Sequence, residues 1–387
     1  MKQAVVVDAV RTPVAKASAD KGNFRDVRAE DLSAHAIKSL VERTGIDPHL
    51  IEDVKWGCVQ QQGEQGFDVG RIACIIAGLP IEVAGVTINR NCGSSLTALN
   101  DAAMYIAAGN DDIQIVGGVE HMHHVPMDKG YSVAPSLLYK YSEAMMNMGL
   151  TAEYLSMKYQ VGRTEQDEFA ARSHQLAAEA TNGGHFEPEI VPTWGRDDNG
   201  HKTLITKDQG IRYDCTTEGL SALRPAFNPA GGSVTAGNSS QLSVGSVAML
   251  MMSEEKAKEL GYKPMAKVIA NAVVGVDPCE MGIGPVPAVN KALQRAGLTI
   301  DQIDAIELNE AFAVQALSVL KCLGVGVDNV NRRGGAVALG HPLGASGARI
   351  ATTLLHRMRD ENARYGIATM CIGQGQGIAT VFESCLV

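Results

Sequence analysis

The chain has 387 residues, of which 45% are hydrophobic and 20% are charged, and its formal net charge is −9. This composition is typical of a soluble globular protein long enough for two or three structural units. The acidic balance, the lack of a long Lys/Arg block and an aromatic content of only 5% argue against nucleic acid as a partner.

The eight cysteines are scattered along the chain without CxxC pairs or zinc-ligand spacing. In a chain of this length they indicate reduced thiols in a reducing compartment, not a disulfide framework. The N-terminal apolar run ends at Asp8, too early for the hydrophobic region of a signal peptide. No stretch reaches the roughly eighteen apolar residues of a membrane span. We therefore expect a cytoplasmic protein with no membrane span.

The first part of the chain alternates strand-like and helical patterns. An apolar run from Ala4 predicts a strand, and a helical pattern follows over 36–41. Further strands are predicted around Val54 and at 84–88, followed by a helix rich in small residues and a strand at 112–118. This alternation favours parallel sheets with both faces covered by helices.

A constant offset of 252 residues relates two parts of the chain. At this offset 36–41 falls on 288–293, and 92–95 falls on 344–347. A gapless shift over roughly 60 residues favours an internal duplication, although any two αβ units share a helix–glycine–strand rhythm. The helices after the two small-residue turns can pack closely on each other. We therefore expect a layered sandwich with helices in the middle.

The duplication divides the chain into two halves around an insertion. Residues 1–118, completed by about 241–265, form the predicted N-terminal half, and 266–387 form the C-terminal half. The segment 119–240 is predicted as an inserted loop domain that carries substrate specificity, as long insertions on repeated scaffolds usually do. Within it, a capping pattern predicts a helix over about 164–181.

Three turns of small residues carry groups capable of covalent chemistry. Cys92 lies where a predicted strand meets a helix, and backbone N–H groups at a helix start stabilise a thiolate and an oxyanion. His341 lies between Gly340 and Pro342, where a stiff backbone fixes the direction of the ring. Cys371 is followed by alternating glycines, which weaken a strand unless a ligand or another backbone comes close. One sulfur could form a covalent intermediate while the other moves protons.

Each candidate also has a purely structural explanation. Cys92 could be a buried cysteine of the core, and His341 could be a hydrogen-bonded loop histidine. Asn309 follows the predicted strand at 304–308, where open α/β sheets hold ligands, but it could equally cap a helix. The glycines after Cys371 lack the spacing and the downstream acid of a dinucleotide site, so we expect no nicotinamide or flavin cofactor.

The histidine run His121, His123 and His124 suggests a metal site. Adjacent histidines point in different directions, and no carboxylate or cysteine spacing supports a site here. We therefore expect no metal.

Over essentially its whole length the chain resembles the thiolase family. The motifs that carry this resemblance are Cys92-Gly93-Ser94-Ser95, Met281-Gly282-Ile283-Gly284-Pro285, Asn309-Glu310-Ala311-Phe312, Gly340-His341-Pro342 and Cys371-Ile372-Gly373. Three further segments resemble the degradative branch of the family: Trp56-Gly57-Cys58-Val59-Gln60-Gln61, Gly117-Gly118-Val119-Glu120-His121-Met122 and Val125-Pro126-Met127. More narrowly, they resemble the bacterial 3-ketoacyl-CoA thiolases that form the β-subunit of the fatty acid oxidation complex. The resemblance implies an α/β fold of two duplicated βαβαβαββ halves, stacked as a five-layered α-β-α-β-α sandwich with an inserted loop domain.

The resemblance also implies a role for each candidate residue. Cys92 would be the acylated nucleophile, and His341 would lower its pKa and contribute to one oxyanion hole with a water held by Asn309. Cys371 would be the acid and base. The backbone N–H groups of Cys92 and Gly373 would form the second oxyanion hole.

The implied reaction is cleavage of a 3-ketoacyl-CoA by CoA to acetyl-CoA and a shortened acyl-CoA in fatty acid β-oxidation. CoA is then a co-substrate, contacted by Ser240 and Met281, and no cofactor is bound permanently. Alternatives are a biosynthetic acetoacetyl-CoA thiolase and a non-catalytic acyl-CoA or sterol carrier of the same fold. The implied assembly is a homodimer or a dimer of dimers, with a hydratase/dehydrogenase α-subunit as a further partner.

Five positions depart from the family pattern: Val244 stands where Asp is usual, Asn91 where an apolar residue is common and His123 where a small one is, and the pair 332–333 is unusually basic. None of them removes a predicted catalytic group. They leave the acyl chain length and the complex-forming partner open.

Overall fold

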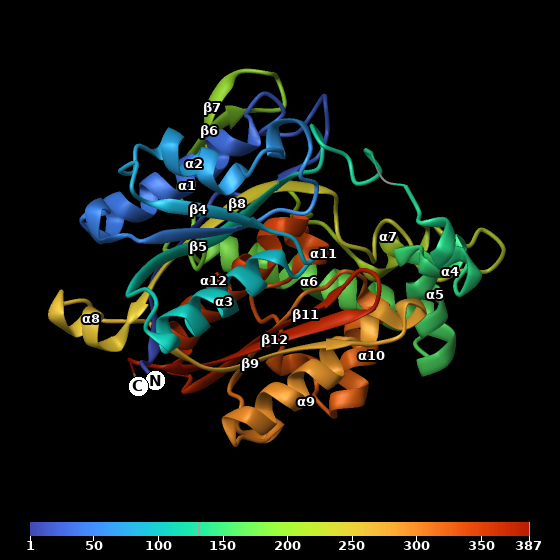
Figure 1. Ribbon diagram of the computed structural model, residues 1–387. Coiled ribbons are helices and arrows are strands. Elements are labelled where there is room, and N and C mark those ends of the chain that lie inside the picture. Colours follow the sequence, from blue (N-terminus) through green and yellow to red (C-terminus); the bar gives the residue numbers. More distant parts are fainter. Residues whose placement is uncertain (131, 387) are drawn as a thin grey trace.

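The computed structural model describes residues 1–130 and 132–386, and Figure 1 shows strands and helices alternating in layers. The N-terminal half consists of β1 (Ala4–Arg11), β2 (Ala15–Lys16), α1 (Ala29–Thr44), β3 (Asp53–Gly57), α2 (Val69–Ala77), β4 (Ala84–Ile88), α3 (Ser94–Ala108), β5 (Ile113–His121), β8 (Ser243–Ser253) and α8 (Glu254–Glu259). The segment between β5 and β8 holds α4 (Glu143–Met146), α5 (Met148–Tyr159), α6 (Arg163–Asn182), β6 (Thr193–Arg196), β7 (Lys202–Ile205) and α7 (Thr217–Ser221). The C-terminal half consists of β9 (Ala266–Gly275), α9 (Pro285–Ala296), β10 (Ala305–Leu308), α10 (Ala313–Leu323), α11 (Ala336–Leu339), α12 (Leu343–Glu361), β11 (Tyr365–Ile372) and β12 (Gln376–Ser384).

The main sheet is mixed, in the order β10-β11-β12-β9-β1-β8-β5-β3-β4, and β2 pairs with β8. β3 runs parallel to β4 and β5, and β10 runs parallel to β11. The central strands β1, β8, β9 and β12 pair antiparallel, so the expectation of purely parallel sheets is wrong there. β11 and β12 are antiparallel as well, because a turn as short as the one that joins them can connect only antiparallel strands.

The two halves of the sheet meet at a short seam. β1 pairs with β9 only at Val5–Lys267 and Val6–Ala266. On either side of this seam the half-sheets separate, and α3 and α12 fill the space between them (Figure 1). α1 and α2 cover the outer face of the N-terminal half-sheet, and α9 and α10 cover the outer face of the other. The expected five layers of the thiolase fold are confirmed.

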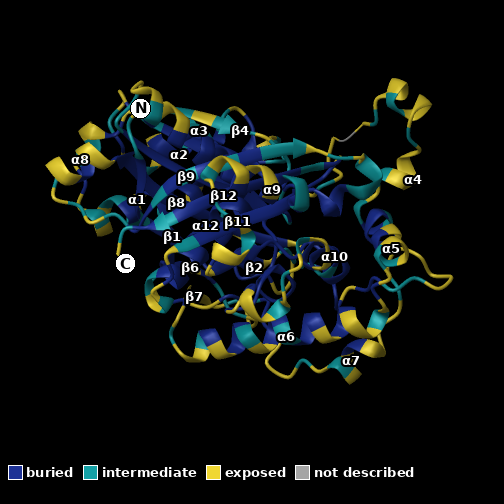
Figure 2. Ribbon diagram, turned by 90° about the horizontal axis from the view of Figure 1, so that it is seen from below, coloured by how far each residue is buried: buried dark blue, intermediate teal, exposed yellow. Residues whose placement is uncertain are grey.

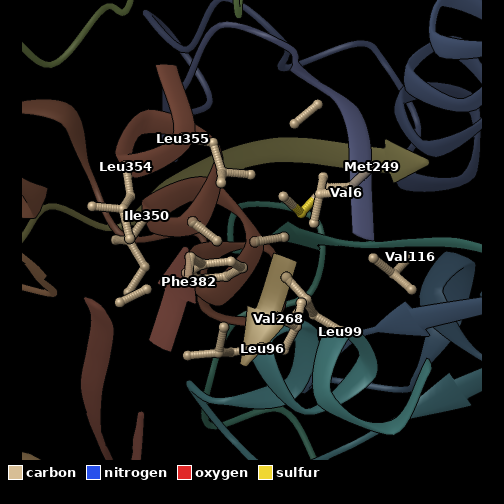
Figure 3. Close-up of a cluster of buried hydrophobic side chains, with 14 of the residues drawn as sticks. Val6, Leu96, Leu99, Val116, Met249, Val268, Ile350, Leu354, Leu355 and Phe382 are labelled. Atoms are coloured by element: carbon tan, nitrogen blue, oxygen red, sulfur yellow. The ribbon is translucent and has the colours of Figure 1, made fainter. Parts of the chain in front are cut away.

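The core lies around the two central helices. Figure 3 shows Leu96 and Leu99 of α3 packed with Ile350 and Leu354 of α12 among side chains of the surrounding strands, such as Phe382. Every residue of α12 from Leu343 to Met358 is buried, and Figure 2 shows exposed residues gathered on peripheral helices such as α4 and α7. A helix buried on all sides is expected between two sheets, where no face meets water.

The predicted offset of 252 residues matches the structure. It maps Asp53 at the start of β3 onto Ala305 of β10, and Ile113 at the start of β5 onto Tyr365 of β11. The small-residue helices α3 and α12 likewise correspond. The duplication therefore relates whole βαβ units, not isolated sequence matches.

The N-termini of α3 and α12 touch backbone to backbone. A Cβ on Gly344 would lie 2.5 Å from the Val119 carbonyl oxygen, and one on Gly347 would lie 2.5 Å from the Leu96 nitrogen. The Ala348 N–H also donates to Ser95 Oγ at 2.9 Å. Only glycine permits this approach, which brings the turns that precede both helices together.

The glycines after Cys371 form a hairpin and not the end of a single strand. Gln374 and Gly375 have φ of 67° and 83° in the turn between β11 and β12. A Cβ on Gly377 would lie 1.9 Å from the Gly284 carbonyl oxygen, so a second backbone does come close, as the glycine pattern predicted.

The inserted segment carries the predicted helix as α6, one residue longer at each end than expected. The Glu165 carboxylate accepts the Gly162 N–H at 2.7 Å at its start. β5 continues as a sheet strand to His121, and β8 begins at Ser243. Among the described residues, no helix combines the length and apolar character needed to cross a membrane.

The contact between the two central helices predicts a stability effect. We expect Gly347→Ala to lower the free energy of unfolding by about 1–3 kcal/mol, because the new methyl group overlaps the Leu96 backbone. Gly326→Ala is the control, since no atom lies within 4 Å of its added Cβ and its φ is −75°. Chemical unfolding measures the free energy of unfolding of both variants. Equal values would mean that moving the two helices apart costs no stability.

Candidate active site

One cavity of about 560 Å³ collects most of the predicted site residues. Cys92, His341, Cys371, Ser240 and Met281 all line it. They come from turns far apart in the sequence, which the helix contact and the hairpin bring together. The two remaining predicted residues do not line the cavity themselves: Asn309 contacts His341, and Gly373 lies beside Cys92.

Cys92 lies in the turn between β4 and α3 and is only 5% exposed. Burial raises the pKa of its thiol to about 11, and the charge of Glu120 adds to this, while hydrogen bonds from the N–H groups of Gly373 and of Cys92 itself lower it. These are the two N–H groups of the predicted second oxyanion hole. The resting side chain is therefore a thiol that needs a base.

His341 is held as a neutral base. Burial lowers its pKa to about 3, and the positive charge of Arg349 lowers it further. Its Nδ1 lies 2.6 Å from Ser346 Oγ, whose hydroxyl reaches the Pro342 carbonyl at 2.9 Å. With the hydroxyl donating to that carbonyl, Ser346 accepts the Nδ1 proton, so Nε2 is the unprotonated nitrogen of the ring.

Asn309 follows β10 and is fully buried. Its Nδ2 lies 3.4 Å from His341 Nε2. Among the described residues its Oδ1 has no hydrogen-bond partner, although it is buried. A buried amide oxygen of this kind normally binds a partner, so it suits the predicted role of holding a water beside His341.

Cys371, the second sulfur, lies at the end of β11 and is 1% exposed. Burial raises the pKa of its thiol, and the nearby Cys92 raises it further. At neutral pH the cavity therefore holds two thiols and a neutral imidazole. This set offers one nucleophile, one base and one acid without any fixed charge among them.

Glu120 is the site residue that the sequence analysis missed. Its buried carboxylate accepts hydrogen bonds from the N–H groups of Val59, Gln60 and Gly344 at 2.8–3.1 Å, and from Gln65 Nε2 at 2.8 Å. Helix α12 has proline at its N-cap and no local side-chain cap, so Glu120 serves as its cap from another strand. The only signal was its place in the phrase 117–122, which gave no hint of a contact with α12.

The wall of the cavity is largely apolar. Met122, Met127 and Met148 line it together with Met281, and Arg212 is the cationic lining residue among those described. Thioether side chains adapt to irregular shapes, which suits an apolar chain of variable length.

The histidine run holds the turn after β5 in place. His121 Nε2 lies 3.1 Å from the Phe24 carbonyl oxygen, and His124 contacts Glu64 Oε1 at 2.9 Å and the Arg25 carbonyl oxygen at 2.8 Å. Glu64, His121 and His124 are the one metal-like group found among the described residues. Their nitrogens already contact protein atoms, so the absence of a metal stays our prediction.

The other departures occupy structural positions. Val244 pairs with His121 in the sheet and is buried. Arg332 and Arg333 form ion pairs with Glu361 at 3.3 Å and Asp360 at 2.5 Å on α12. Asn91 lies beside Cys92 and contacts Gly373.

Comparison with known proteins places this geometry in a family. Residues 4–255 match the thiolase N-terminal domain, and residues 262–384 match the thiolase C-terminal domain. The chain is 55% identical over 387 residues to proteins named 3-ketoacyl-CoA thiolase from Aliivibrio fischeri and Pseudoalteromonas translucida, covering 99% of this chain and 100% and 99% of those proteins. A crystal structure of the Bacillus anthracis acetyl-CoA acetyltransferase is 37% identical, with a TM-score of 0.90 and 99% of both chains covered. The chain therefore belongs to the thiolase family of acyltransferases and to its degradative branch.

Proposed function

We propose that this chain cleaves a 3-ketoacyl-CoA with CoA, giving acetyl-CoA and a shortened acyl-CoA through an acyl-Cys92 intermediate. The observation that carries this proposal is the presence of two neutral thiols and a neutral imidazole on one largely apolar cavity. The names of the curated relatives support the substrate class.

In the first half-reaction His341 Nε2 takes the proton of Cys92, and the thiolate attacks the 3-keto carbon. The keto oxygen becomes an oxyanion held by donors of the site. The bond between C2 and C3 then breaks, and its electron pair leaves as the enolate of acetyl-CoA. The enolate oxygen is stabilised by His341 and a water on Asn309, while Cys371 gives its proton to C2.

In the second half-reaction the roles reverse. The Cys371 thiolate takes the thiol proton of CoA, and the CoA sulfur attacks the carbonyl carbon of acyl-Cys92. The second oxyanion, on the N–H groups of Cys92 and Gly373, collapses and expels the Cys92 sulfur, which regains its proton from His341. Ser240 and Met281, on the same cavity, are placed to contact the pantetheine arm of CoA.

The same residues could run the reverse reaction, a Claisen condensation of two acetyl-CoA molecules. The likeness to an acetyl-CoA acetyltransferase structure favours this second candidate. The methionine-lined wall favours longer apolar acyl chains and hence degradation. Within this proposal, 119–240 acts as the specificity domain, and the protein is cytoplasmic.

For the assembly we propose a homodimer. β4 ends the sheet, and its outer edge has no strand partner among the described residues. Beside it Phe67 is 97% exposed, Ile81 79% and Ile75 60%. An unpaired edge next to exposed apolar side chains suits a second copy of the same surface around a two-fold axis.

The covalent intermediate gives the direct test of the proposed function. Incubation with a 3-ketoacyl-CoA without free CoA should add one acyl group to Cys92, detected by intact-protein and peptide mass spectrometry. Cys92→Ala should give no adduct. Cys371→Ala should still acylate slowly, with turnover reduced by about 10²–10⁴, the usual contribution of a general acid or base. Near-normal thiolysis by Cys92→Ala would refute the assignment of the nucleophile.

The neutral state of Cys92 predicts a pH dependence. Because burial raises the pKa of its thiol to about 11, the thiolate fraction grows with pH below that value. We expect alkylation of Cys92 by iodoacetamide to speed up about tenfold per pH unit between about pH 7 and pH 10. The alkylation rate of Cys322, which is exposed, is measured by peptide mapping of the same samples and serves as the internal control. A plateau near neutral pH would instead mean a resting thiolate–imidazolium pair.

The dimer surface can be tested by Phe67→Asp. Asp tolerates the left-handed backbone at this position, where φ is 48°, but places a charge in the proposed interface. Sedimentation velocity should show a dimer for the unaltered chain and a shift toward monomer for the variant. Tyr139→Asp, at a residue that is 92% exposed on the inserted segment, is the control. A monomeric unaltered chain would disprove the dimer.

A further inference from the structure

Asn91, directly before the nucleophile, occupies a strained position that favours its residue type. Its φ is 45°, in the left-handed region that Asn tolerates better than most other residues with a Cβ. Its N–H donates to Asn89 Oδ1 at 2.8 Å, and its carbonyl accepts from Ser94 Oγ at 2.6 Å and the Ser94 N–H at 3.0 Å. The bend that presents Cys92 is thus built around Asn91.

The side chain of Asn91 reaches across to the second catalytic turn. Its Nδ2 donates to the Gly373 carbonyl oxygen at 3.1 Å. The N–H of the same glycine lowers the pKa of the Cys92 thiol, so it lies close to the sulfur. Both polar backbone groups of Gly373 therefore face the turn of Cys92: its carbonyl is hydrogen-bonded to Asn91, and its N–H acts on the Cys92 thiol.

Packing alone does not fix Gly373. A Cβ built there would meet nothing closer than Asn91 Nδ2 at 3.7 Å and Met148 Sδ at 3.9 Å, which are ordinary contact distances. Gly373 opens the turn of the hairpin, next to Gln374 and Gly375 with their positive φ. Two side chains of the Cys92 turn hold this end of the hairpin, Asn91 through the Gly373 carbonyl and Arg90 through Gln376 Oε1 at 3.4 Å, and the Asn91 bond is the one that reaches Gly373 itself.

We infer that Asn91 is a positioning residue for the acyl transfer: its amide holds the Gly373 peptide so that the Gly373 N–H stays aimed at the Cys92 sulfur and at the oxyanion that forms there. This inference rests on the proposed function, in which acyl-Cys92 is the intermediate. It assigns no contact with substrate to Asn91. Loss of the amide leaves the donor present but poorly aligned, which costs less than losing an oxyanion-hole donor outright.

The test separates the amide from the backbone conformation. Asn91→Gly keeps the left-handed turn without strain and removes only the side chain. We expect kcat to fall about five- to tenfold, the size of one net hydrogen bond, with KM for both substrates unchanged. Asn91→Asp keeps the shape but sets a carboxylate against the Gly373 carbonyl, so its kcat should fall further.

Asn362→Gly is the matched control. Asn362 is also an asparagine at positive φ, 51°, but it is exposed at the end of α12, away from the cavity. We expect its kinetics to equal those of the unaltered chain. The rate at which CoA removes the acyl group from Cys92, measured in a single turnover, should fall only in the two Asn91 variants.

The outcomes distinguish this inference from the proposed function. If the unaltered chain acylates Cys92 but Asn91→Gly deacylates as fast as Asn362→Gly, the positioning role is wrong while the proposed function stands. A change in KM with kcat preserved would also overturn it, since that result indicates a substrate contact. If the unaltered chain forms no adduct on Cys92, the proposed function fails, and this inference fails with it.

Discussion

The contact between the N-termini of α3 and α12 is the constraint on which the site depends. Gly347 lets α12 approach the first turn of α3 at backbone distance, and Gly344 lets it approach the ends of β3 and β5. Cys92 lies just before α3, and His341 lies just before α12. A larger side chain at Gly347 would separate the helices and, with them, Cys92 and His341. The spacing between Cys92 and His341 therefore depends on the backbone contact between the two helices, and not on the side chains of the cavity wall.

Burial sets the electrostatics of this site. The same desolvation that raises the pKa of both thiols lowers that of His341, so all three groups are neutral at rest. A charge that forms during the reaction then meets fixed N–H groups and little water. Each of these N–H groups stabilises a negative charge more strongly in such a site than in solvent, because no water competes for the charge. Under the proposed function, the same N–H groups that lower the pKa of the Cys92 thiol would stabilise the oxyanions of the reaction.

Most of the fold could be predicted because the duplication preserves loop lengths. The offset of 252 related β3 to β10 and β5 to β11 before any strand was placed. Strand direction could not be predicted, since local periodicity does not distinguish a hairpin from a crossover, and the strand after Gly373 was missed. Glu120 was missed for a similar reason: its partners lie near residues 60 and 344, and no pattern in its own segment marks such distant contacts. Cys92, His341 and Cys371 were found because each lies in a turn of small residues, whereas Ser240 and Met281 came from the resemblance to the thiolase family.

At the site, each duplicated half contacts a turn of the other half. At the offset of 252, Glu120 at the end of β5 corresponds to Ile372 at the end of β11. The first strand end caps α12 of the other half through the bond from Gly344 to Glu120. The second strand end contacts the start of α3 of the first half, through Asn91 and Gly373. Each half thus fixes the catalytic turn of the other, although one contact uses a carboxylate and the other a backbone carbonyl. An active site at a pseudo-symmetric interface needs both contacts, because neither half alone can orient both its own turn and that of its partner.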